Sequence, residues 1–202
     1  KGTLVSAFCI NYYKQTKVPV VGVSCSWGGS STNTWLNRGL VTQTQKSVKA
    51  AKKYLKKNKV NIRHIYMVWY QGESDAAQGV TEGTYISRMK KIYKKMHKVG
   101  VEKIFVIRIG HDMMSPEKDY TIMKAQEKLC ESNKNFIMVS KKAAKYRSSY
   151  PGYYSDTIHL NQSFNFIKIV EELLFFFYRE CIMLAGMGMQ WRICCQSQQY
   201  TQ

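Results

Sequence analysis

The sequence has few acidic residues and no long apolar run. Thirteen Asp and Glu stand against 31 Lys and Arg, which gives a formal net charge of +18 over 202 residues. The apolar stretches near the C-terminus are interrupted by Arg179 and Glu180, so they are shorter than the ~20 residues that a membrane-spanning helix needs. The sequence therefore predicts no membrane span.

Cysteines at metal-ligand spacing are also absent. The sequence contains no Cys-x-x-Cys, and no His lies at metal-ligand spacing from a cysteine. This pattern indicates neither a metal site nor the disulfide framework of a small secreted domain. We therefore expect reduced, partly buried thiols at the six cysteines, which are Cys9, Cys25, Cys130, Cys181, Cys194 and Cys195.

Lysine carries most of the positive charge and is concentrated in two segments, 46–59 and 90–98. Both segments have the spacing of amphipathic helices, and the lysines lie opposite the apolar stripe. A solvated helix face explains this pattern, and so does attraction to nucleic acid, an anionic surface or an acidic glycan. No helix-turn-helix, RNA-recognition or zinc-finger pattern accompanies the charge, so we predict no nucleic-acid partner.

Apolar strands and amphipathic helices alternate along most of the chain. The pattern predicts helices over 1–16, 40–57, from Thr81 to about 99, from Pro116 onward and over 163–180, and strands over 18–23, 62–69, 103–109 and 136–139. This rhythm is typical of a parallel sheet with helices on both faces. A hydrophobic content of 45% is ordinary for a globular protein, and the length allows one domain with a sizeable core.

Residues 175–202 do not follow this rhythm. We interpret residues 1–174 as the domain and residues 175–202 as an atypical C-terminal tail. The end of the tail, from Cys194 onward, has no periodicity. A helix extension, an interaction tail and an aberrant terminus all remain open for it.

The stretch from Trp69 to Asp75 (Trp-Tyr-Gln-Gly-Glu-Ser-Asp) follows the apolar run 62–69. In a parallel sheet, such a switch from apolar to polar residues marks the carboxyl end of a strand, where ligand-binding loops gather. One amide, two carboxylates and a hydroxyl suit an active-site loop. Ser and Asp are also favoured at helix N-caps, so a capping cluster is an equal alternative on local grounds.

Two other segments contain residues suited to a site. Trp27-Gly28-Gly29-Ser30 follows the predicted strand 18–23, and paired glycines allow the backbone to approach a ligand with its N–H groups. Asp156-x-x-His159 places a carboxylate three residues before a histidine, where it can orient the ring and leave one nitrogen as a general base. Each segment alone is a weak indication.

The three segments occur in one order along an α/β chain: Trp-Gly-Gly-Ser with a Trp five residues beyond, Trp-Tyr-Gln-Gly-Glu-Ser-Asp, and Asp-Thr-Ile-His-Leu-Asn-Gln. That order resembles the sialate O-acetylesterase and acetylxylan esterase branch of the SGNH (GDSL-like) hydrolases, over about residues 5–172. The resemblance implies a three-layer α/β/α sandwich with a flavodoxin-like parallel sheet. It also implies hydrolysis of acetyl esters on a carbohydrate substrate, with no metal and no cofactor.

The resemblance assigns roles to particular residues. His159 would be the general base, and Asp156 or Glu73 would be the carboxylate that orients it. Gly29 matches the family's backbone oxyanion donor, with Gly28 and Ser30 beside it. Gln71 and Gly72 would line the same pocket, and Gln71 is our choice for the side-chain oxyanion donor.

The nucleophile is where the chain departs from the family. The family's serine lies in a Gly-x-Ser motif after the first strand, and no serine in this chain takes its place. We therefore expect an N-terminally truncated, inactive fragment whose nucleophile and first, central strand lie upstream. In a 2-1-3-4-5 sheet, residues 18–23 would then lose a neighbour. The alternative is a non-catalytic glycan-binding pseudoenzyme domain. The sequence does not indicate which acetylated sugar is bound, nor the compartment or the oligomeric state.

Overall fold

A computed structural model describes residues 4–111, 116–143 and 191–197. Five parallel strands form one sheet in the order β1-β5-β2-β3-β4. Their bounds are β1 Val20–Ser24, β2 Ile62–Trp69, β3 Lys103–Ile107, β4 Phe136–Ser140 and β5 Trp191–Ser197. The predicted strand 62–69 agrees with β2 at both ends, whereas β3 ends two residues before the predicted boundary.

Six helices accompany the sheet in the described residues: α1 Leu4–Thr16, α2 Thr32–Asn37, α3 Leu40–Lys57, α4 Glu73–Ala77, α5 Glu82–His97 and α6 Pro116–Ser132. The predicted helix 40–57 agrees with α3 at both ends. Thr81 caps α5 as expected, because its side chain accepts a hydrogen bond from the Thr84 N–H. The short helices α2 and α4 were not predicted. No described helix is long and apolar enough to cross a bilayer.

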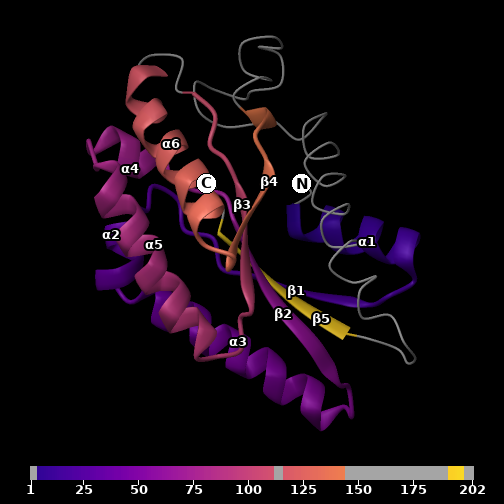
Figure 1. The fold of residues 1–202 in the computed structure, drawn as a ribbon. Helices are drawn as coiled ribbons and strands as arrows, with labels where there is room; N and C mark the ends of the chain where they lie inside the picture. The colour runs from indigo at the N-terminus through magenta and orange to yellow at the C-terminus, as the bar shows by residue number, and fades with distance from the viewer. Residues whose placement is uncertain (1–3, 112–115, 144–190, 198–202) are drawn as a thin grey trace.

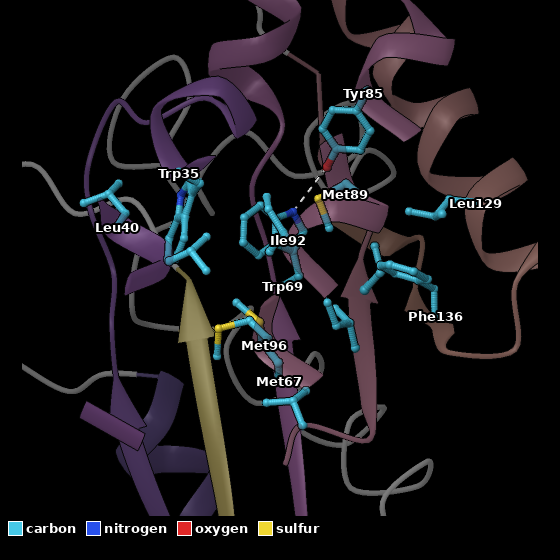
Figure 2. Packing of buried hydrophobic residues seen from close by; sticks show 14 of the residues in the cluster. Trp35, Leu40, Met67, Trp69, Tyr85, Met89, Ile92, Met96, Leu129 and Phe136 are labelled. Carbon is cyan, nitrogen blue, oxygen red and sulfur yellow. Dashed lines mark hydrogen bonds between the residues drawn. The ribbon is translucent and has the colours of Figure 1, made fainter. Parts of the chain in front are cut away.

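The helices lie on both faces of the sheet, so the architecture is the predicted α/β/α sandwich (Figure 1). On one face, Phe8 and Tyr12 of α1 pack with Tyr66, Val68 and Phe105 of the sheet. On the other face, α2, α3, α5 and α6 cover alternate residues of the same strands (Figure 2). This second cluster is the larger core, and its most buried members include Trp35, Met67, Trp69, Met89, Ile92 and Leu129.

β5 contradicts the prediction that residues 18–23 lack a neighbour in the sheet, and it places residues 191–197 of the C-terminal tail in that sheet. β1 does not lack a neighbour, because β5 pairs with it from Val20↔Arg192 to Ser24↔Gln196. β5 also pairs with β2, from Ile62↔Trp191 to Trp69↔Ser197. Residues 191–197, for which no strand was considered, thus occupy an interior position of the sheet, between the edge strand β1 and β2. Seven residues without clear periodicity are accepted there because two parallel neighbours satisfy their backbone groups on both sides.

Several predicted features lie outside the described residues. They are the helix over 163–180, the proposed domain boundary at residue 174, and the Asp156-x-x-His159 segment. Their predictions stand untested.

Candidate active site

The glycine loop leaves β1 at Ser24 and ends where α2 begins. Gly28 and Gly29 are exposed, and Gly29 has a φ of +63°, a left-handed conformation that side chains other than glycine rarely adopt. A Cβ at Gly29 would meet nothing within 4 Å, so conformation, not space, explains the glycine. Trp27 projects from the same loop with 55% of its surface exposed.

Ser30 holds this loop in place. Its hydroxyl donates to the Trp27 carbonyl at 2.7 Å and accepts from the Trp35 Nε1–H at 3.0 Å. Ser31 then caps α2 through a capping box with Thr34. The buried Ser30 hydroxyl is therefore used inside the loop, and the surface that remains for a ligand is the exposed backbone around Gly28 and Gly29.

Gln71 joins the second predicted segment to this loop. Its side chain is 1% exposed, and its Nε2 donates to the Ser30 carbonyl at 2.9 Å and to Asp75 Oδ2 at 2.7 Å. Both partners are acceptors, which fixes the orientation of the amide. The two amide hydrogens are thus engaged, so Gln71 has none left for an oxyanion. The predicted side-chain donor at Gln71 does not fit this arrangement, and its role here is to position the loop.

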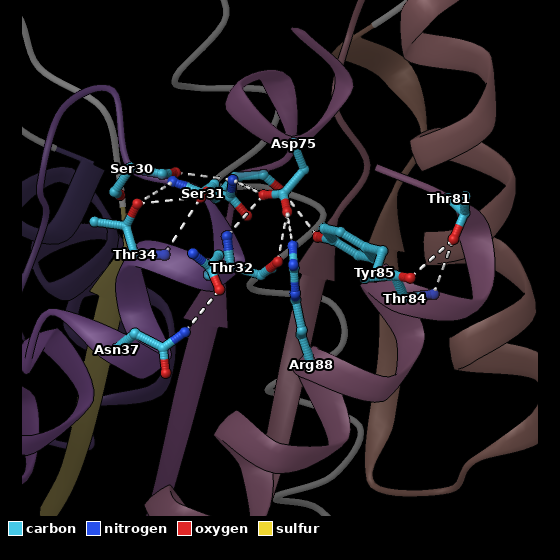
Figure 3. Close-up of polar contacts among 12 residues, drawn as sticks. Ser30, Ser31, Thr32, Thr34, Asn37, Asp75, Thr81, Thr84, Tyr85 and Arg88 are labelled. Carbon is cyan, nitrogen blue, oxygen red and sulfur yellow. Dashed lines mark hydrogen bonds and ion pairs between the residues drawn. The ribbon is translucent and has the colours of Figure 1, made fainter. Parts of the chain in front are cut away.

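Asp75 is the centre of the polar network, and sequence reasoning assigned it no role (Figure 3). It is fully buried and accepts from the Thr32 backbone N–H at 2.8 Å and from the Thr32 hydroxyl. Arg88 Nη1 lies 3.7 Å from Asp75 Oδ1. Its four-residue separation from Gln71 was the available signal, whereas Thr32 and Arg88 belong to no local motif.

A second layer of hydrogen bonds supports the backbone of Gln71. The Tyr85 hydroxyl donates to the Gln71 carbonyl at 3.1 Å and accepts from Trp69 Nε1–H at 3.2 Å. Gln126 Nε2 donates to the same carbonyl at 2.9 Å. Burial, followed by the nearby charge of Asp75, raises the pKa of Tyr85, so the hydroxyl stays protonated and remains a donor.

Gly72 and Glu73 complete the described part of the site. A Cβ at Gly72 would lie 2.9 Å from Ile122 Cγ2 of α6 and 3.0 Å from Ile109 Cγ2, so any larger residue would press on these two side chains. Glu73 is half-buried as the first residue of α4, and its Oε2 accepts from the Gly72 N–H at 3.0 Å. The structure therefore brings together the glycine loop, Gln71 and the Gly72–Glu73 pair. Asp156 and His159 lie outside the described residues.

The comparison with family models agrees with this architecture. The model of the family described as "Carbohydrate esterase, sialic acid-specific acetylesterase" matches residues 3–165. No curated protein and no solved structure matches the chain significantly. The family match spans most of the chain and includes all three segments that suggested a site. This chain belongs to the sialic acid-specific acetylesterase family of carbohydrate esterases.

Proposed function

We propose that this protein hydrolyses acetyl esters on sugars through a serine nucleophile, with His159 as the general base. The observation that carries the proposal is the network in which Asp75 and Gln71 tie the glycine loop to the end of β2. Rigid placement of the Gly29 backbone beside the strand ends suits stabilisation of a developing oxyanion. One such donor is worth roughly 3 kcal/mol of barrier.

The strand position between β1 and β2 bears on the identity of the nucleophile. Only one strand can pair with both, and here that strand is β5. Its last residue, Ser197, pairs in register with Trp69, two residues before Gln71. A nucleophile carried by an upstream strand would need the same position in the sheet. These facts support Ser197 as the nucleophile of this chain, in place of the serine expected upstream.

The proposed reaction has two steps. The Ser197 hydroxyl attacks the acetyl carbonyl carbon while His159 takes its proton, and the ester bond then breaks as His159 returns the proton to the sugar oxygen. Water next attacks the acetyl-serine with His159 again as the base, which releases acetate and free Ser197. Asp156 or Glu73 orients His159, and the bond from the Gly72 N–H holds one Glu73 oxygen in place.

Acetate release from acetylated sugars and from p-nitrophenyl acetate tests the function. We expect His159→Ala to lower kcat/KM by about 10³-fold or more, because the general base is lost. His97→Ala is the control, since His97 ends α5 and contacts the Val101 carbonyl just before β3 begins, away from the carboxyl ends of the strands, and should leave activity nearly unchanged. Activity that survives His159→Ala would overturn the proposal.

A non-catalytic glycan-binding domain is the second candidate, and the exposed Trp27 favours it. Exposed aromatic rings beside a polar loop can pack on the apolar faces of sugars. This alternative predicts binding of acetylated sugars with no acetate release. Equal affinity of wild-type protein and Trp27→Ala, together with turnover, would exclude it.

A further inference from the structure

A groove of about 410 Å³ runs between α2 and α5, on the helical layer that covers the larger core. One wall is formed by Asn33, Leu36 and Asn37 of α2. The other wall is formed by Arg88 and three lysines of α5, which are Lys91, Lys94 and Lys95, and by Lys98, which follows the helix. The groove contains no acidic residue in its lining, so its electrostatic character is strongly positive.

The four lysines have no carboxylate to neutralise them in the part of the chain that the structure describes. Lys91, Lys95 and Lys98 are exposed and lie three or four positions apart, so they face the groove together. Like charges at this spacing repel one another and destabilise a helix. Arg88 differs, since it lies 3.7 Å from the buried Asp75. An external anion is the partner that would remove this repulsion.

The opposite wall indicates what kind of anion fits. The Asn33 and Asn37 side chains are exposed and joined by a 2.7 Å hydrogen bond, and amides at this position can also bond to hydroxyl groups. Leu36 adds an apolar contact between them. The lining contains no aromatic ring on which a nucleic-acid base could stack. Cations facing amides and one aliphatic side chain suit a sugar chain better than a nucleic acid.

The groove also begins beside the candidate active site. Thr32 is the first residue of α2, and Arg88 is the groove residue nearest the start of α5. Both contact Asp75 (Figure 3). A polymer lying along α5 would therefore reach the glycine loop at one end. We infer that the groove between α2 and α5 binds a linear polysaccharide that carries carboxylates. The choice of carbohydrate rests on the family of the chain and not on the proposed catalytic residues.

Binding of polygalacturonate to the full chain tests the inference. We expect binding that weakens as salt is added, because exposed charge pairs are screened. The variant K91Q/K95Q/K98Q should bind about tenfold more weakly and with a smaller salt dependence. The control K49Q/K53Q/K56Q removes the same number of charges from exposed positions of α3 and should change the affinity less than about twofold.

Four results would overturn the inference. Equal weakening in both triple variants would mean that overall charge, not the groove, attracts the polymer. Tighter binding of single-stranded DNA at the same salt concentration would make the groove a nucleic-acid surface. Absence of polygalacturonate binding, or equal binding of a neutral xylan, would exclude recognition of carboxylates. Equal melting temperatures of the two variants would show that lost binding is not lost folding.

Discussion

At the scale of single residues, Asp75 determines how the glycine loop sits against the end of β2. Asp75→Ala would leave the Thr32 N–H and hydroxyl and one Gln71 amide hydrogen without their buried acceptor, and Arg88 without its ion-pair partner. We expect a loss of roughly 3 kcal/mol in the free energy of unfolding. Urea denaturation measures this loss. Asp75→Asn keeps one acceptor oxygen and should cost less, so an equal or larger loss in that variant would contradict the account.

Gly72 and Gly83 offer a matched pair of glycine substitutions. Gly72→Ala would place a Cβ against Ile122 and Ile109, and we expect a loss of about 1–3 kcal/mol in the free energy of unfolding. A Cβ at Gly83, in the first turn of α5, meets nothing within 4 Å. Gly83→Ala should therefore stabilise the protein by about 0.5 kcal/mol. We expect the melting temperature to fall in Gly72→Ala and to rise in Gly83→Ala. An unchanged melting temperature in Gly72→Ala would show that α6 moves to make room for the methyl group.

At the scale of elements, β5 completes the sheet by pairing with β1 and β2. Ile193 lies opposite Val21 on one side and Ile65 on the other. Ile193→Pro removes a backbone N–H in a strand that is paired on both sides and should cost about 3 kcal/mol or more. Ile193→Val keeps the backbone bonds and is the control. Amide hydrogen exchange in β1 should accelerate in the proline variant. Equal exchange in both variants would show that β1 and β5 are not paired.

The elements also show what the sequence allowed us to predict. α3 was predicted to the residue because its apolar residues recur at helical spacing over 18 positions, and β2 because it is one apolar run, interrupted only near its start. α2 and α4 were missed because five or six residues give too little periodicity. β5 was missed because its place depends on a vacancy between β1 and β2, which is a property of the whole sheet. Gln71 was predicted in the site, but its bonds to Ser30 and Asp75 required coordinates.

At the scale of the whole molecule, the last described strand lies inside the sheet, between β1 and β2 (Figure 1). The chain therefore brings residues from its beginning, its middle and its end to one edge of the sheet. Ser24 of β1, Trp69 of β2 and Ser197 of β5 end there together, next to the glycine loop and Gln71. This arrangement gives the C-terminal segment a direct part in the proposed chemistry.

Labelling with a serine-reactive fluorophosphonate, followed by mass spectrometry of the labelled peptide, would identify the nucleophile. We expect a single label, on the peptide that contains Ser197. The label should be lost in Ser197→Ala and strongly reduced in His159→Ala, because the proposed base activates the hydroxyl. A label on another serine in an active protein would remove Ser197 from the mechanism and leave the esterase function intact. No label and no acetate release would contradict the catalytic account as a whole.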